Sequence, residues 1–552
     1  MNPSTEIFER LQDEYLQAWL RFHPELSVLT GRADHAHRLR SYSDDDNGAL
    51  ITLNRKLLSA FDEIDTGSLD EDSRVDLAVL KSAASIELHE LEERNWRFRD
   101  PLEYVPVDSI YQLLTHPLKD VHGAIRQKLE DIPEYLRGAQ GMLREQREQV
   151  VPLWLGNSIE QSRSGAKFIR DLVRNPLFTK LFTNPNKLQP IIDEAARALE
   201  GFANVMETEI APHAAGDFAC GRAHFDRLLN EKHFLATDVD GALRLGERLY
   251  RETRDELIEL TRKMQGDEDV DALLEKIRCN HPEPAQLLDV YRERMHATTD
   301  WLEDSDIVSL PETQSLSIQQ TPQFLASHIP FAAYDPPMLN DAEQQGYYYV
   351  TLPEDAESMK EHNYTSIHLT CAHEAFPGHH MQFVLANQHH GDNLTRALHR
   401  SATLYEGWAL YCEDLVIQQG LLSNDEHRFI SLRDRLWRCL RIIIDCSIHT
   451  GQMSLEQAAQ RMIDELGFTR AQAEAELNWY TSAPSTPMCY ATGFEMIRQA
   501  RFQVVDRSGA ELKLFHDKLL DQGSIALPLV LQRSFSPVVW QRVHTSLFQS
   551  GE

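Results

Sequence analysis

The sequence predicts a mainly α-helical protein: a large helical body with a deep cleft and a small β-sheet near a metal site. Amphipathic stripes, with apolar residues three and four apart, run through most of the 552 residues. Only two short stretches have the β-branched and aromatic composition of strands. No sequence repeats at a fixed period, which argues against a solenoid.

The first predicted helix covers residues 5–22, because its large side chains recur every three or four positions: Phe8, Leu11, Tyr15, Trp19 and Phe22. Pro24 ends this helix, since proline has no backbone N–H to donate. Similar stripes predict helices at about 48–64, 73–96, 124–149, 190–212, 239–265, 270–278 and 284–303. Residues 1–325 are therefore expected to form a largely helical scaffold lobe.

Residues 326–552 are expected to form the lobe that carries the metal site. Strands are predicted around 327–334 and 345–352, the second of which contains Gly346-Tyr-Tyr-Tyr-Val and ends at Pro353. Further helices are predicted at about 365–390, 395–420, 425–449, 455–465, 470–481 and 490–505. No flexible linker separates the lobes, so we expect a single unit over residues 1–552.

Two motifs in the second lobe concentrate side chains that bind metals. Residues 373–380 read His-Glu-Ala-Phe-Pro-Gly-His-His, and residues 406–411 read Glu-Gly-Trp-Ala-Leu-Tyr. Imidazoles with a separate carboxylate are typical of a one-zinc hydrolytic site, which leaves one position for water. Glu374 is placed to take a proton from that water. An imidazole-rich ligand set favours zinc over magnesium or calcium, whereas manganese, cobalt and iron stay open.

The second histidine ligand depends on how the first motif folds. In an unbroken helix, His380 would lie roughly 10 Å along the axis from His373, too far to share one ion. Pro377-Gly378 is expected to interrupt the helix, because proline cannot donate a backbone hydrogen bond and glycine tolerates unusual backbone geometry. The shorter path favours His379 as the second ligand, with His380 as the runner-up.

The two motifs together resemble the hallmark of a bacterial family, domain of unknown function 885, and the resemblance is nearly full-length. It extends to other stretches: Pro24-Glu25-Leu26 before Gly31, Gly346 to Tyr349, Tyr490 to Gly493, Arg501, and Phe515 to Asp517. That family is similar to helical zinc peptidases typified by thimet oligopeptidase and angiotensin-converting enzyme. The resemblance implies a zinc-peptidase-like unit in which three residues bind one Zn²⁺ and Glu374 is the general base; the three are His373, His379 and Glu406.

Four further roles are open at the level of sequence. Glu413 or Asp414 could orient a ligand histidine. Tyr490 is either a core aromatic residue or a phenol that stabilises the oxyanion formed at the scissile carbonyl. The tyrosine run that includes Tyr348 either packs the small sheet or forms an edge strand that pairs with substrate. Arg501 is either a surface cation or a clamp for a terminal carboxylate.

Composition favours a soluble enzyme. The net charge of −31 argues against nucleic acid and anionic membranes as partners. No signal peptide and no long apolar run is visible, and the seven cysteines are scattered. These features predict a cytoplasmic protein with reduced thiols and no membrane partner.

We therefore predict a zinc-dependent metallopeptidase that cleaves short peptides. A metal-dependent amidase acting on a small amide, a non-catalytic metal protein and a metal-free helical scaffold are the alternatives. Substrate, mode of cleavage and oligomeric state are open at this level.

Overall fold

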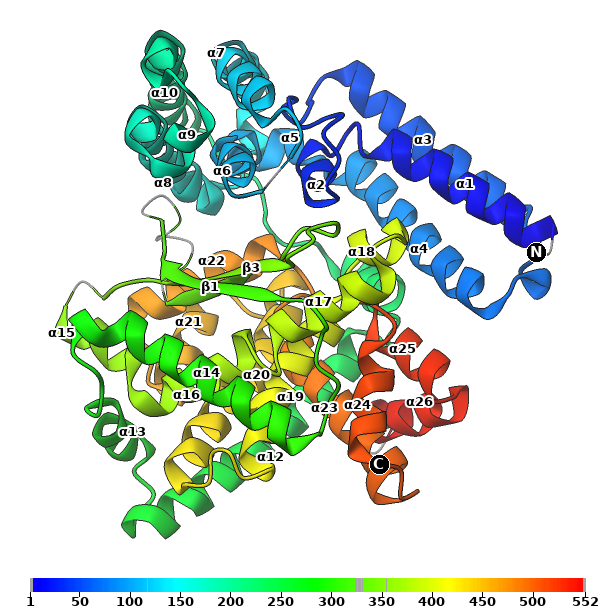
Figure 1. Ribbon diagram of the computed structural model, residues 1–552, viewed down its shortest axis with the longest axis vertical. Coiled ribbons are helices and arrows are strands. Elements are labelled where there is room, and N and C mark those ends of the chain that lie inside the picture. The colour runs from blue at the N-terminus through cyan, green and yellow to red at the C-terminus, as the bar shows by residue number, and fades with distance from the viewer. Residues whose placement is uncertain are drawn as a thin grey trace. The chain divides into compact units, whose positions relative to one another are not determined.

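The computed structural model describes residues 3–116, 118–322, 325, 329, 331–353 and 355–549. It confirms a mainly helical protein with one small sheet (Figure 1). The chain divides into two compact units: Met1–Phe218 with Pro322–His328 and Met338–Ala342, and Ala219–Thr321 with Ile329–Pro337 and Glu343–Glu552. Both motifs with candidate metal ligands lie in the second unit. Residues 219–321, which the sequence analysis grouped with the scaffold lobe, belong to it as well.

Helices are the only regular elements of the first unit over the residues that the structure describes. Its helices are α1 (Pro3–Trp19), α2 (Pro24–Leu29), α3 (Asp44–Asp62), α4 (Glu71–Glu93), α5 (Trp96–Arg99), α6 (Val107–Thr115), α7 (Val121–Glu145), α8 (Pro152–Asp171), α9 (Pro176–Leu181) and α10 (Gln189–Val205). Helix α10 packs against α7 and α8. The apolar stripe of α7 supplies fully buried core residues at the predicted helical spacing, including Ile125, Leu129 and Ile132.

The second unit contains the remaining helices. They are α11 (Arg222–Arg227), α12 (Val239–Gln265), α13 (Val270–Arg278), α14 (Leu287–Ser305), α15 (Ala356–Met359), α16 (Tyr364–Glu374), α17 (His379–His390), α18 (Leu394–Leu398), α19 (Ala402–Gln418), α20 (Asp425–His449), α21 (Leu455–Leu466), α22 (Arg470–Ser482), α23 (Cys489–Arg501), α24 (Leu512–Leu520), α25 (Leu527–Ser534) and α26 (Pro537–His544). Helix α12 packs along α20, and α19 packs along α23. Among the described helices, none is both long and apolar enough to cross a bilayer.

A three-stranded sheet belongs to the second unit: β1 (Ser315–Gln320), β2 (Ala332–Asp335) and β3 (Gln345–Val350). Strand β3 lies in the centre, parallel to β1 and antiparallel to β2, so that Tyr348 pairs with Ile318 on one side and Tyr334 on the other. The sequence analysis missed β1. Strand β2 begins at Ala332, and several residues of the predicted strand 327–334 lie outside the described residues.

Of the two alternatives for the tyrosine strand, the edge position is wrong. Both sides of β3 are occupied by neighbouring strands, so its backbone hydrogen-bonding groups are already paired and cannot take an extended substrate. The aromatic run therefore has the other role considered at the sequence level, which is packing. Tyr348 is 0% exposed and its ring lies 5.6 Å from that of Tyr291 on α14.

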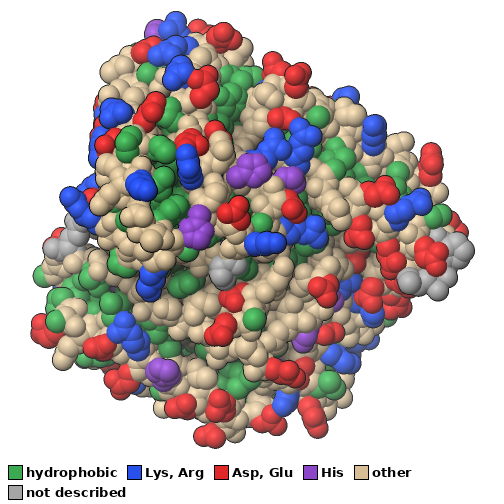
Figure 2. All heavy atoms as spheres, turned by 45° about the horizontal axis from the view of Figure 1, so that its top comes forward, with side chains coloured by type: hydrophobic (Ala, Val, Ile, Leu, Met, Phe, Trp, Pro, Cys, Tyr) green, Lys and Arg blue, Asp and Glu red, His purple; other side chains and the backbone are tan. Residues whose placement is uncertain are grey.

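Acidic and basic side chains are interspersed on the face of the molecule drawn in Figure 2. Many exposed charges form ion pairs such as Arg144–Glu209, whose Nε and Oε2 atoms lie 2.7 Å apart. Exposed pairs of this kind contribute little to stability, typically about 0–1 kcal/mol each. The fold therefore depends mainly on its buried helical faces.

Candidate metal centre

The first motif forms a sharp turn between two helices, which confirms the predicted interruption. Helix α16 ends at Glu374 and α17 begins at His379. A Cβ atom on Gly378 would lie only 1.7 Å from the carbonyl oxygen of His373, so a side chain cannot be accommodated there. The carbonyl of Pro377 accepts a hydrogen bond of 2.7 Å from the indole N–H of Trp408. This bond ties the turn to α19, the helix that carries the second motif.

Close contact between two glycines sets the position of α23 against α19. A Cβ atom on Gly407 would lie 2.6 Å from the Cα of Gly493, and one on Gly493 would lie 2.1 Å from the carbonyl oxygen of Thr403. The two backbones can approach this closely only because neither glycine has a side chain. The contact places Tyr490, one turn earlier on α23, near Glu406.

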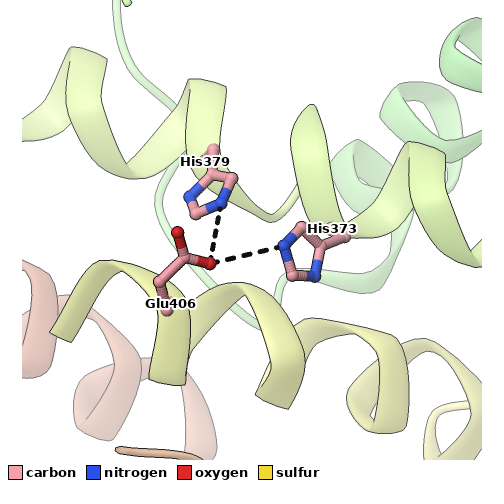
Figure 3. A group of neighbouring side chains, drawn as sticks. All are labelled: His373, His379 and Glu406. Carbon is pink, nitrogen blue, oxygen red and sulfur yellow. Dashed lines mark ion pairs between the residues drawn. The ribbon is translucent and has the colours of Figure 1, made fainter. Parts of the chain in front are cut away.

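Three side chains from α16, α17 and α19 converge in the interior of the second unit (Figure 3). One ligand atom from each of His373, His379 and Glu406 lies within 4.8 Å of the other two. The Nε2 atoms of His373 and His379 are 3.7 and 3.4 Å from Oε2 of Glu406. Both histidines are buried.

These distances suit a shared metal ion better than direct hydrogen bonds. A hydrogen bond between nitrogen and oxygen spans about 2.7–3.2 Å. Ligands about 2.0–2.2 Å from a tetrahedral zinc ion lie roughly 3.4 Å apart. In addition, Oε2 of Glu406 is buried and accepts no hydrogen bond from the described residues. The two imidazoles and the carboxylate therefore fit a zinc ion in number, chemistry and spacing.

Glu413 orients His373. It is one of the two residues that the sequence analysis considered for this role. The Nδ1 atom of His373 donates to Oε1 of Glu413 at 2.8 Å, which leaves Nε2 directed at Glu406. Burial opposes the charged form of His373, but the neighbouring carboxylates of Glu406 and Glu413 outweigh it and raise its pKa to about 10. Asp414, the other alternative, lies elsewhere: burial raises the pKa of its carboxyl group, and the nearby Arg435, Arg501 and Arg498 only partly oppose the shift.

Glu374 is largely buried beside the two histidines. Burial raises the pKa of its carboxyl group, while the nearby His373 and His379 partly oppose the shift. A carboxylate in such surroundings is a stronger base than one in water, because its charged form is poorly solvated. This environment is suited to proton transfer.

Tyr490 also reaches the centre, from α23. Burial raises the pKa of its phenol well above the ordinary value, and the nearby charge of Glu406 adds to the effect. The guanidinium of Arg441 lies 4.6 Å from the centre of the Tyr490 ring. Tyr490 therefore keeps its proton and is available as a hydrogen-bond donor at the centre.

The family model described as "Bacterial protein of unknown function (DUF885)" matches residues 24–533. The chain belongs to this family. None of the curated proteins is similar to it in sequence.

Two solved structures resemble this DUF885 protein over almost their whole length. The first is a putative lipoprotein of unknown function from Shewanella oneidensis, with 19% identity, a TM-score of 0.76, and coverage of 95% of this chain and 99% of that one. The second is a putative lipoprotein from Colwellia psychrerythraea, with 15% identity, a TM-score of 0.78 and full coverage of both chains. At these identities the likeness concerns the fold alone.

His380, the runner-up ligand, does not point at Glu406 in the DUF885 protein. Its Nδ1 atom lies 3.0 Å from the hydroxyl of Tyr334, and its Nε2 atom lies 2.9 Å from Oε1 of Gln314. Both ring nitrogens are thus engaged. Gly346 makes room for this arrangement, because a Cβ there would lie 2.7 Å from Nδ1 of His380.

The two residues predicted to bind substrate are either buried or already hydrogen-bonded within the protein. The structure buries Tyr348 completely, although its hydroxyl lies near enough to Glu374 for the carboxylate to add to the rise in pKa that burial causes. Arg501 donates from one terminal nitrogen to the hydroxyl of Tyr411 at 3.1 Å and to the amide oxygen of Gln418 at 2.9 Å. The structure therefore brings Tyr490 to the candidate metal centre, but not Arg501.

Sequence reasoning missed an aromatic wall around His379. The rings of Tyr334, Phe383 and Tyr405 have centroids 6.3, 5.9 and 6.2 Å from that of His379. Phe383 and Tyr405 had a usable signal, because one stands four residues after His379 on α17 and the other directly precedes Glu406. Tyr334 comes from β2, and nothing in the sequence places that strand beside α17.

The two neighbouring histidines give a direct test of the ligand set. We expect His379→Ala to reduce zinc affinity strongly, because it removes one of three converging ligands. His380→Ala removes the contacts to Tyr334 and Gln314 and the packing against Phe376, so zinc should be retained with a smaller loss of activity. Zinc content of both purified variants, measured together with thermal unfolding, checks this. Loss of zinc from His380→Ala beside full occupancy in His379→Ala would contradict the assignment.

Proposed function

We propose that this DUF885 protein is a zinc-dependent hydrolase, and specifically a metallopeptidase acting on short peptides. The observation that carries the proposal is the convergence of three ligand atoms, two Nε2 and one Oε2, within 4.8 Å of one another. Glu374, directly after the first ligand in sequence, supplies the base that such hydrolysis needs. The resemblance of the two motifs to those of helical zinc peptidases favours an amide substrate.

His373, His379 and Glu406 would hold the zinc ion, which when bound supplies Lewis acidity to a carbonyl group and to water. Glu374 accepts a proton from the attacking water and returns it to the leaving amine. The phenol of Tyr490 donates a hydrogen bond to the oxyanion that develops on the scissile carbonyl. Glu413 keeps His373 in the tautomer that leaves Nε2 free.

The proposal is tested by metal analysis and a peptide screen on the same preparation. We expect about one zinc ion per chain and hydrolysis of members of a short-peptide library. A chelator should abolish the hydrolysis, and added zinc should restore it. Hydrolysis of small amides without peptides would instead indicate an amidase. Bound zinc without hydrolysis would indicate a non-catalytic metal protein, and a metal-free protein would overturn the proposal.

A further inference from the structure

Arg400, directly before the helix that carries Glu406, has a guanidinium without a charged partner. The side chain is largely buried. Its Nε–H donates to the carbonyl of Ala397 at 3.0 Å. Among the described residues, no acceptor is recorded for its two terminal nitrogens and no carboxylate lies within 4.0 Å of them. A largely buried guanidinium with open donors is costly unless an anion binds to it.

The guanidinium lies against the aromatic wall of the metal centre. Its carbon is 4.7 Å from the centre of the Phe383 ring, which in turn lies 5.9 Å from the centre of the His379 ring. Arg400 is therefore separated from the His379 ring by at most about 11 Å, the sum of these two distances. The Phe383 ring therefore neighbours both the open cation and a proposed zinc ligand.

The surroundings of Arg400 leave its positive charge uncompensated. Burial lowers its pKa, and the nearby Tyr405, Tyr334 and Asp335 only partly oppose this. Burial likewise raises the pKa of Asp335 to about 6, although Arg400 acts against the shift. Asp335 and Arg400 are thus close enough to influence each other's pKa but form no ion pair within 4.0 Å.

We propose that Arg400 binds the carboxylate of the substrate, which makes peptides with a free C-terminal carboxylate the preferred substrates. This inference rests on the proposed function. Guanidinium groups bind carboxylates through two parallel, charge-assisted hydrogen bonds, and Arg400 has its terminal donors open for both. The sequence had suggested Arg501 for this role, but that side chain is engaged with Tyr411 and Gln418.

The distance between Arg400 and the His379 ring also suits a substrate whose carboxylate lies close to the scissile bond. An extended residue spans about 3.3–3.6 Å, and a charge-assisted hydrogen bond adds about 2.7–2.9 Å. A carboxylate one or two residues beyond the scissile carbonyl can therefore reach Arg400 while that carbonyl lies at the metal centre. Cleavage is thus expected near the C-terminus of the peptide.

The test compares two ligands that differ only in the terminal charge. N-acetylated Ala-Ala-Phe and its C-terminal amide are titrated into the zinc-loaded Glu374→Gln protein by calorimetry, so that binding is measured without turnover. We expect the acid to bind about 10- to 100-fold more tightly than the amide, the scale of hydrogen bonds to a charged group. Adding Arg400→Gln should bring this ratio close to one, and Arg400→Lys should restore part of it.

Arg433→Gln is the matched control. Arg433 is also partly buried and lies over a phenylalanine ring, 5.4 Å from the centre of Phe468, but it is paired with Asp434 at 3.0 Å. The acid-to-amide ratio should survive this change, which alters net charge in the same way. Thermal unfolding and zinc content show whether Arg400→Gln damages the fold. If it does, the acid-to-amide ratio of Arg400→Lys is the deciding measurement.

The outcomes separate this inference from the proposed function. Equal binding of acid and amide, no binding of the acid, or loss of the preference in Arg501→Gln rather than Arg400→Gln would overturn the role of Arg400. A free-acid preference that depends on Arg400, in a protein that hydrolyses no peptide, would support the carboxylate site and refute the peptidase. Peptides whose only carboxylate is the side chain of an internal Glu, with an amidated C-terminus, should bind no better than neutral amides. A gain from the internal carboxylate that depends on Arg400 would overturn the preference for the terminal one.

Discussion

His373→Ala and Glu406→Ala are each expected to lower bound zinc from about one ion per chain to well below one and to abolish hydrolysis. Each variant removes one of three converging ligands, and two ligands hold zinc far more weakly than three. Glu406→Ala also leaves the two histidines without the carboxylate that lies 3.4 and 3.7 Å from their Nε2 atoms. Elemental analysis and a hydrolysis assay on the same samples measure both effects.

Buried residues of the same types, away from the centre, supply the controls for these variants. His516 is fully buried and lies 2.9 Å from the hydroxyl of Tyr411, and Glu495 is 2% exposed and pairs with Arg498. His516→Ala and Glu495→Ala should lower thermal stability yet retain zinc. Full zinc occupancy in both His373→Ala and Glu406→Ala would contradict the assignment of these residues as zinc ligands.

Glu374→Gln is expected to retain zinc while turnover falls by about 10²-fold or more, the usual scale for loss of a general base. Glutamine keeps the shape and the hydrogen-bonding capacity of glutamate but cannot accept a proton. Burial raises the pKa of Glu374, so the neutral amide should be tolerated without loss of stability. Turnover, zinc content and melting temperature together distinguish chemistry from damage.

Turnover close to normal in Glu374→Gln would show that another group takes the proton. Loss of zinc in this variant would instead indicate that Glu374 supports the ligand histidines. A Glu374→Asp variant, which keeps the carboxylate but shortens its reach, should recover only part of the activity.

Helices that have both a clear apolar stripe and capping residues in the sequence were predicted closely. Helices α12 and α20 have the bounds Val239–Gln265 and Asp425–His449, as expected from their stripes. Asp238 and Asn424 cap their first turns through side-chain oxygens, and Gly266 ends α12 with a positive φ of 92°. Such signals act within one turn of the chain, so sequence alone contains them.

Helix α8 shows why other elements were missed. Its buried face includes Ser158, Gln161 and Ser162, together with Gly165, whose Cβ would lie 2.4 Å from Val107. Small and polar residues suit a close helix contact, but here they interrupt the apolar stripe between Leu155 and Ala166. Strand β1 was missed for a related reason: its six residues, Ser-Leu-Ser-Ile-Gln-Gln, carry only two apolar side chains.

By itself, the sequence determined the candidate histidine ligands and the interruption between them, because proline and glycine act on the backbone locally and because His373 and His379 stand within seven residues. The tertiary structure decided what depends on distance between remote segments. It put β3 in the centre of its sheet, engaged His380 with Tyr334 and Gln314, and set Arg400 rather than Arg501 beside the aromatic wall. Periodicity reports which face of a helix is buried, whereas only packing determines which residue from another helix or strand meets that face.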